Sequence, residues 1–283
     1  MKKAVYFSLF IPTIENSNYY SMLYHALETL QLVYKNQYDV VVFYSVPGTA
    51  LDNHVHLNSF NLVKDFPWVK FIQSDYHVNH SNIYMHKWYN LEKVFDLNYD
   101  KVFYLDCDVV FNKDPSYMFD RYYDNSMWAL IEGHDTLVYK LLNCPGVPSG
   151  QFIISKKLFD KCNNLHDRIL LKQKVLIEQA YVALTKIEAE WFSNLSEQYA
   201  AQLVIQDSGV NIHALSIADV CFGVSAFTVK LINNIPVVSV GENAITHYFG
   251  KNDYIFVPDR LKTPDMHQKI SDIDPAVFFN ILY

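Results

Sequence analysis

The stretch KVFYLDCDVVFNKDP, residues 101–115, decides how this 283-residue chain is to be interpreted. Its apolar run VFYL, residues 102–105, has the continuous hydrophobic character of a parallel strand covered on both faces, and Asp is rare inside strands. We therefore expect the strand to end where Asp106 and Asp108 begin. Side chains at i and i+2 of an extended chain point the same way, so both carboxylates can reach one hard cation with Cys107 turned aside.

An Asp-x-Asp triplet also has an ordinary explanation, because two acids suit a turn that closes with Asp114-Pro115. A second triplet, Asp272-Ile273-Asp274, has no strand before it and lies in the polar run 269–275, where we expect a solvated turn. The first triplet differs because it follows an apolar strand. We therefore predict that Asp106 and Asp108 bind a metal ion, and that this ion holds a diphosphate.

The composition excludes several classes of protein. With 51% hydrophobic and 16% aromatic residues, the chain is globular, and a net charge of −7 without a Lys/Arg cluster argues against a nucleic-acid or anionic-membrane partner. The four cysteines show no C-x-x-C spacing, so we expect free thiols in a reducing compartment. No apolar stretch approaches the roughly 20 residues that span a bilayer, and the first residues read as a strand. A soluble, cytoplasmic protein is the prediction.

Short apolar runs alternate with amphipathic helical stretches, which is typical of βαβ units and a mostly parallel sheet flanked by helices. Besides the strand that ends at Asp106, the pattern predicts strands at 4–10, 39–45, 68–73, 127–133, 150–155 and, more briefly, near 209–215, 226–231, 236–240 and 244–248. Helices are predicted from about 16–18 to 35, from 81–82 to 95, and over most of 156–203. No repeat or linker divides the pattern, so we predict one α/β domain over 1–258 and a tail over 259–283 that packs on it.

The glycines exclude two common phosphate-binding loops. Walker and Rossmann loops need closely spaced glycines after a strand, and the eight glycines of this chain are scattered. The first strand leads into Ile11-Pro12-Thr13, which contains no glycine. A bound nucleotide diphosphate therefore needs a metal ion in place of a loop of backbone amides.

Four sequence islands, in this order and spacing, carry a resemblance to a known family. They are Lys87-Trp88, YLDCDVVFNKDP at 104–115, PSGQF at 148–152 and HYFG at 247–250. Over roughly residues 4–251 the chain resembles the glycogenin-like, family 8 type of GT-A glycosyltransferase. The resemblance implies a single Rossmann-like GT-A domain.

The resemblance also implies a set of ligands for a UDP-sugar donor and its metal ion. The metal ligands would be Asp106, Asp108 and His247, a set of oxygens and one imidazole that suits Mn²⁺, with Mg²⁺ as the alternative. The residues implied in donor binding are Lys87, Asp106, Asp108, Ser149, Gly150, Gly250 and Lys251. The N-terminal tyrosine that stacks on the base in the family corresponds to Tyr19 or Tyr20.

The implied reaction moves a hexose from the UDP-sugar to a hydroxyl of a glycan, protein or lipid, with retention of the anomeric configuration. Glu132, His134, Asp135, Glu197 and Gln198 are the polar candidates for holding donor sugar and acceptor, and we select Asp135 and Gln198. Three departures from the family pattern stand out. Lys251 directly follows the last glycine, Pro148 replaces an Asn, and Glu197-Gln198 matches the family's Asp-Gln pair only loosely.

Alternatives remain open for single residues and for the whole chain. Lys87 at a helix start could be a solvated surface charge, His247 could be structural, and Gly150 could serve only a close approach within the sheet. A protein of this fold could also be a catalytically inactive carbohydrate-binding or interaction module. A third possibility is a sugar-nucleotide hydrolase, because water can replace the acceptor at the same site.

Overall fold

The computed structural model describes residues 1–10, 18–45, 62–76, 84–131, 148–216, 218–222, 227–232, 235–240 and 245–247. By their contacts the residues group into two compact units. The first unit comprises Met1–Tyr20, Asn36–Cys107 and Ser116–Leu215, and the second comprises Ser21–Lys35, Asp108–Pro115 and Ser216–Tyr283. The predicted tail at 259–283 lies outside the described residues, so the predicted domain limits stay a prediction.

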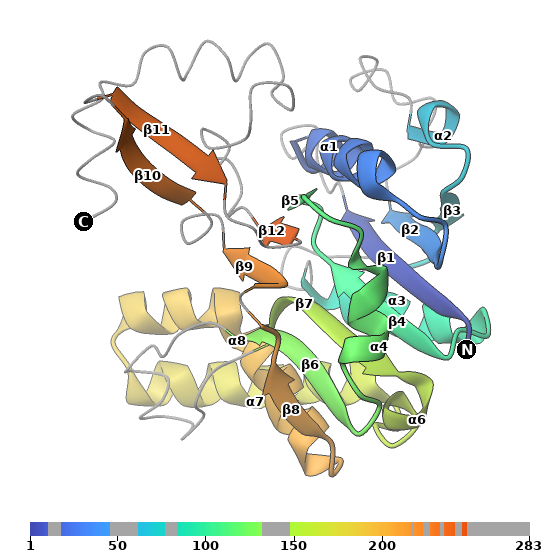
Figure 1. Cartoon of the computed structure of the whole chain (residues 1–283). Coiled ribbons are helices and arrows are strands. Elements are labelled where there is room, and N and C mark those ends of the chain that lie inside the picture. Colours follow the sequence, from blue (N-terminus) through green and yellow to red (C-terminus); the bar gives the residue numbers. More distant parts are fainter. Residues whose placement is uncertain are drawn as a thin grey trace. The chain divides into compact units, whose positions relative to one another are not determined.

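Within its described residues, the first unit is built on a seven-stranded sheet in the order β3-β2-β1-β4-β7-β6-β8 (Figure 1). All neighbouring strands are parallel except β7, which is antiparallel to β4 and to β6. The bounds are β1 Lys3–Phe10, β2 Asp39–Ser45, β3 Lys70–Gln73, β4 Lys101–Leu105, β6 Ser126–Ile131, β7 Pro148–Ser155 and β8 Asn211–Ala214. The predicted mostly parallel sheet is confirmed, and so is the strand end immediately before Asp106.

The helices of the first unit include two long ones, α7 and α8, within the region 156–203 that was predicted to be mostly helical. Their bounds are α2 Leu62–Asp65, α3 His86–Asp96, α4 Met118–Arg121, α6 Lys156–Phe159, α7 Leu165–Ala183 and α8 Lys186–Asp207. Asn164 interrupts the stretch before α7 with a left-handed backbone at φ 52°. Thr185 starts α8 with a capping box, in which its hydroxyl and the Glu188 carboxylate bond to each other's backbone amide. The left-handed residue at 164 and the capping box at 185 explain why 156–203 is several helices.

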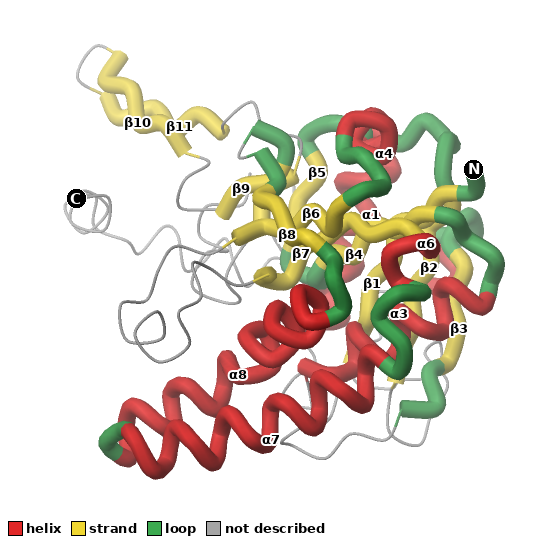
Figure 2. Tube along the Cα trace, turned by 90° about the horizontal axis from the view of Figure 1, so that it is seen from below, coloured by secondary structure: helices red, strands yellow, loops and turns green. Residues whose placement is uncertain are grey.

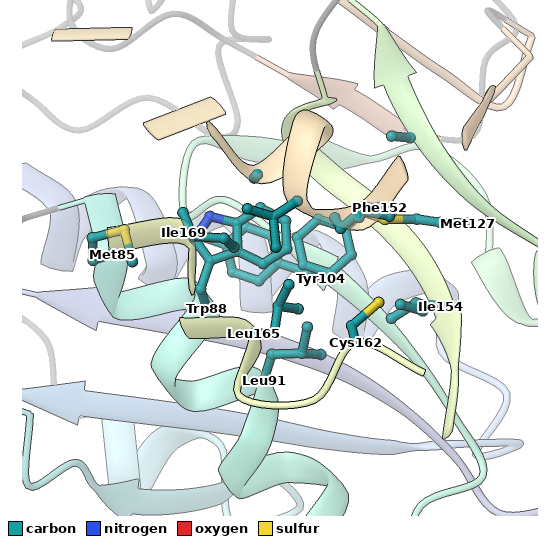
Figure 3. Packing of buried hydrophobic residues seen from close by; sticks show 14 of the residues in the cluster. Met85, Trp88, Leu91, Tyr104, Met127, Phe152, Ile154, Cys162, Leu165 and Ile169 are labelled. Carbon is teal, nitrogen blue, oxygen red and sulfur yellow. The ribbon is translucent and has the colours of Figure 1, made fainter. Parts of the chain in front are cut away.

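One continuous core joins α3, α7 and α8 to one face of the sheet (Figure 3). Tyr104 and Phe152 of the strands and Trp88 of α3 lie together in this core. Tyr6 of β1 belongs to the same core and contacts the rings of Tyr104 and Phe152. On the opposite face the alternate strand residues, among them Phe103, are buried as well. Burial on both faces is what a mainly parallel sheet requires, and it explains the continuous apolar runs in the sequence.

The second unit contains short strands together with most of helix α1, Asn18–Val33. Strands β5 Val109–Phe111, β12 Ile245–His247 and β9 Val220–Phe222 form a small sheet in that order, and β10 Phe227–Ile232 pairs with β11 Ile235–Val240. The Thr29 hydroxyl of α1 accepts a hydrogen bond from the backbone amide of Phe111 in β5, with a distance of 3.2 Å between nitrogen and oxygen. Strands β5 and β9 were not predicted. A search of the described residues of the whole chain finds no helix with the length and apolarity to cross a bilayer.

Candidate functional site

Asp106 is the first residue after β4 and is held by the strand that precedes it. The Tyr104 hydroxyl donates to Asp106 Oδ1 at 2.6 Å, since residues two apart on an extended chain point to the same side. Burial raises the pKa of Tyr104 well above its usual value, and the neighbouring Asp106 charge raises it further. Tyr104 therefore stays a proton donor at any physiological pH and fixes one carboxylate oxygen.

Gly150 of β7 lies directly against the Asp106 carboxylate. The antiparallel register places Tyr104 opposite Phe152, so Asp106 and Gly150, each two residues further along, come next to each other. A Cβ atom added at Gly150 would lie 1.4 Å from Asp106 Oδ2 and 2.2 Å from its Cγ. Only glycine leaves room for this carboxylate, so the close approach that we considered for Gly150 is present.

A buried ion pair joins α3 and α8 in the same unit. Lys87 Nζ lies 3.3 Å from Glu197 Oε1, with 6% and 1% of the two side chains exposed. The indole Nε1 of Trp88 donates to the same oxygen, and Trp88 stacks on Phe152 with ring centroids 4.9 Å apart. The view of Lys87 as a solvated surface charge is therefore wrong, because α3 turns it inward beside the core.

Charges of both signs surround the Glu197 carboxyl group. Burial is the largest effect on this carboxyl and raises its pKa, while the Lys87 charge and the Trp88 hydrogen bond lower it. The negative charge of Asp106 raises the pKa of Glu197 again, so Asp106 is close enough to interact electrostatically. Asp106, Glu197 and Lys87 thus form a group of interacting charges at the carboxyl end of β4.

Gln198, one of the two predicted catalytic residues, follows Glu197 on α8. Its side chain is half-buried, and its Oε1 atom has no hydrogen-bond partner among the described residues. A buried amide oxygen without a partner is uncommon in folded proteins. An amide oxygen that can accept a hydrogen bond suits the role predicted for Gln198 in holding donor sugar and acceptor. That role stays a prediction.

In the second unit, the predicted ligands Asp108 and His247 are related by the pairing of β5 and β12. His247 is paired with Val109, the residue that follows Asp108 in the chain. The His247 side chain lies outside what the structure describes. Among the described side chains, no group of three or more His, Cys, Asp or Glu residues is arranged to hold a metal ion. The predicted set of Asp106, Asp108 and His247 therefore stays a prediction.

Several predicted site residues fall outside the described residues or side chains. Asp135, Glu132, His134, Gly250 and Lys251 are outside the described residues, and only the backbone of Ser149 is described, within β7.

Of the two candidates for stacking on a base, Tyr20 is 1% exposed and its hydroxyl accepts the Leu62 amide at 3.3 Å. Tyr19 is 38% exposed. Burial thus leaves Tyr19 as the residue with an accessible ring.

Sequence reasoning missed the supporting role of three aromatic residues. The sequence placed Tyr104 in an apolar strand, and Trp88 and Phe152 in two of the islands, with no supporting role for any of them. Tyr104 and Trp88 donate hydrogen bonds to Asp106 and Glu197, and Phe152 stacks on Trp88. For Tyr104 a signal was present, because it lies two residues before Asp106 on the same side of one strand. For Trp88 and Phe152 no local signal exists, since their partners are far along the chain.

Comparisons with known proteins give structural matches only. No family model matches the sequence, and no curated protein matches it. The glycosyltransferase GlyE of Streptococcus pneumoniae TIGR4 is similar in structure, with 14% identity and a TM-score of 0.55 over 99% of this chain and 63% of that one. Its apo form gives 13% identity and a TM-score of 0.51, over 99% and 62%. A glycosyltransferase involved in the glycosylation of the major capsid of PBCV-1 matches over 96% of this chain and 100% of that one. Its identity is 8% and its TM-score is 0.48.

The likeness to GlyE shows the fold. The chain spans less than two thirds of the length of the GlyE chain. At 14% identity a shared fold does not transfer a reaction, because chemistry depends on the site and not on the scaffold. The predicted GT-A-type α/β fold is confirmed, and the glycogenin-like, family 8 assignment stays a prediction.

Proposed function

We propose that this chain is a metal-dependent glycosyltransferase that moves a hexose from a UDP-sugar to a hydroxyl acceptor, with retention. The observation that carries the proposal is the cluster at the carboxyl end of β4, where Asp106 lies on Gly150 and Lys87 pairs with Glu197. In open α/β sheets, ligands bind outside the carboxyl ends of the strands. The fold shared with the glycosyltransferase GlyE supports the same class of reaction.

Lys87 and Glu197 are the groups that we assign to the donor sugar. A buried ion pair adds little stability over apolar residues of the same size, so its presence needs another reason. A carboxyl whose pKa is shifted by burial and by a second carboxylate is typical of functional sites. An ammonium and a carboxylate can bind sugar hydroxyls as donor and acceptor, and the Trp88 indole fixes the orientation of Glu197.

The ligands proposed for the metal ion are Asp106, Asp108 and His247. Asp106 and Asp108 are two residues apart, and the pairing of His247 with Val109 supports a place for the histidine next to Asp108 in the second unit. Two carboxylates and an imidazole fit Mn²⁺, with Mg²⁺ as the alternative. A bound divalent ion would act as a Lewis acid that neutralises charge on the leaving diphosphate.

Within this chain, Tyr104 would hold Asp106 in one orientation while the donor binds. Ser149, Gly150, Gly250 and Lys251 are proposed to line the donor, and Asp135 and Gln198 to hold donor sugar and acceptor. With retention, the acceptor oxygen attacks from the face that the diphosphate leaves.

Calorimetric titration of UDP into the purified protein, with and without Mn²⁺, tests the proposal. We expect binding that requires Mn²⁺ and is lost in Asp108→Ala. The matched control is Asp274→Ala, which changes the second Asp-x-Asp triplet and should bind as the unchanged protein does. Absence of UDP binding in the unchanged protein, with either metal condition, would overturn the UDP assignment.

A turnover assay with UDP-sugars separates transfer from the two alternative functions. Transfer requires that an acceptor increase the rate of sugar loss from the donor. Release of free sugar at one rate with and without acceptor would indicate a hydrolase. Binding of Mn²⁺ and UDP without turnover of any donor would indicate an inactive binding module.

A further inference from the structure

The outer face of helix α7 carries exposed apolar side chains along much of its length. The inner face of α7 packs into the core and beside α8 (Figure 2). On the outer face, Leu171 is 66%, Val175 40%, Tyr181 51% and Val182 90% exposed. A surface helix normally presents polar residues to water, and several large apolar residues on one exposed face mark an interaction surface.

Charged residues divide this apolar face in a regular way. Asp167, Leu171, Lys174, Glu178 and Tyr181 follow each other at intervals of four, three, four and three residues, so they form one stripe along the helix. Lys174 and Glu178 occupy the middle of the stripe, and both are exposed. Within the described part of the chain, neither side chain takes part in an ion pair. The stripe therefore has a charged centre, Lys174 and Glu178, with the apolar Leu171 on one side and Tyr181 on the other.

The stripe on α7 is complementary to the same stripe on a second, antiparallel copy of the helix. A second α7 placed antiparallel, with a two-fold axis level with residue 176, brings Leu171 opposite Tyr181 of the second copy and Lys174 opposite Glu178 of the second copy. The two-fold axis repeats each pairing, as an isologous interface requires. A parallel arrangement would instead place Lys174 against Lys174 and Glu178 against Glu178. Charge thus selects the antiparallel orientation.

We propose that the outer face of α7 binds the same face of a second copy of this chain, as an antiparallel helix pair. The second copy covers Leu171 and Tyr181 and also pairs the charges of Lys174 and Glu178. An anionic membrane is a less suitable partner, because Asp167 and Glu178 on the stripe and the net charge of −7 on the chain would repel it. A pair of single helices is a small interface, and interfaces below about 1,200 Å² are weak. The dimer should therefore form with rising protein concentration.

Charge reversal tests the pairing in a way that loss of folding cannot imitate. Lys174→Glu and Glu178→Lys each place two like-charged pairs in the proposed interface, and we expect each variant alone to dimerise about tenfold more weakly. An equimolar mixture of the two variants restores both opposite-charge pairs and should dimerise as the unchanged protein does. Sedimentation velocity over a range of concentrations measures the dimer dissociation constants of the unchanged protein, of each variant and of the mixture. Circular dichroism checks folding.

Two further variants complete the test. Leu171→Asp should weaken the dimer of the full chain, whereas Lys157→Glu, an exposed charge on α6, should leave it unchanged. A protein that stays monomeric at the highest concentration, or a dimer that ignores both charge reversals, would overturn the proposal. Binding to neutral phosphatidylcholine vesicles that Val182→Asp abolishes, without dimerisation, would overturn it in favour of a membrane contact.

Discussion

The two ends of strand β4 both bury charged side chains, and they neutralise them in different ways. At the amino end, Lys101 is 2% exposed. Its Nζ donates to the carbonyl oxygens of Phe119 and Tyr122 and pairs with Asp124 Oδ1 at 2.7 Å. An ammonium has three donors, so the protein itself fills the capacity of this group. The amino end is therefore closed to any further ligand of Lys101.

At the carboxyl end, side chains rather than backbone carbonyls surround the charges. Lys87 pairs with Glu197, and burial together with the nearby Asp106 charge raises the pKa of Glu197. Backbone carbonyls that fill the donors of Lys101 give this charge a structural role. A group of interacting ionisable side chains at a strand end fits a role in binding.

The largest effect on stability is expected from Lys87→Met at the carboxyl end. This change leaves Glu197 buried without a cation, which typically costs about 3–5 kcal/mol. Because the pKa of Glu197 then rises further, the loss should be full above that raised pKa and shrink as the pH falls through it. Urea-induced unfolding at several pH values measures the free energy.

The control for this change is the double variant Lys87→Met with Glu197→Gln. Removing the uncompensated charge should recover most of the stability and none of the sugar transfer. A single variant as stable as the unchanged protein would show that the two groups are not a buried pair.

At the amino end, Lys101→Met should destabilise the fold by about 3 kcal/mol, because it leaves buried carbonyl oxygens without a donor. UDP affinity should stay within about twofold, less than 0.5 kcal/mol, because no part of the proposed site involves this end. Unfolding and calorimetric titration give the two numbers. Loss of UDP binding in a folded Lys101→Met protein would contradict the division between the two ends.

Much of the sheet could be predicted from the sequence, because the strands of a parallel sheet are buried on both faces and read as apolar runs. The same reasoning gave the strand end at Asp106. The three-residue strands β5 and β9 could not be predicted, since they owe their existence to pairing with β12, more than twenty residues away from either. Such short strands have no periodicity of their own.

Within the site, the types of the residues could be predicted from the sequence, but their surroundings could not. The burial of Lys87 depends on Glu197, 110 positions along the chain, and no local pattern shows that pairing. Gly150 was predicted through the resemblance. The reason that this position requires glycine is the pairing of β7 with β4, which places the Asp106 carboxylate where a Cβ atom would lie. Long-range pairing, rather than propensity, decides both.

A smaller loss of stability is expected from Gly150→Ala, with a large loss of function. The added methyl group would overlap the Asp106 carboxylate, and overpacking of this kind costs about 2 kcal/mol. Asp106 must turn away, so Mn²⁺-dependent UDP binding should be lost.

Gly209→Ala is the matched control for this change. Gly209 adopts φ +70°, and a Cβ atom there would meet no atom within 4 Å. The control should cost about 1 kcal/mol of backbone strain and leave UDP binding unchanged. Retained binding in Gly150→Ala would show that Asp106 is not a ligand.

The smallest predicted effect is a loss of stability in acid that arises from His86, the residue before Lys87 at the start of α3. His86 is 2% exposed, its ring packs against Phe10 and Tyr76, and neither ring nitrogen has a hydrogen-bond partner among the described residues. Burial lowers the pKa of His86 to about 3. The unfolded chain therefore binds a proton that the folded protein excludes, so stability is full above the usual pKa and falls below it.

With a pKa near 6.5 in the unfolded chain, lowering the pH from 8 to 5.5 should remove about 1.4 kcal/mol through His86 alone. Urea-induced unfolding at the two pH values should show this loss in the unchanged protein and about 1.4 kcal/mol less of it in His86→Phe. His213→Gln, which replaces an exposed histidine, should keep the acid sensitivity. Equal pH dependence in His86→Phe and the unchanged protein would contradict the prediction, because it would mean that the acid sensitivity arises from other groups.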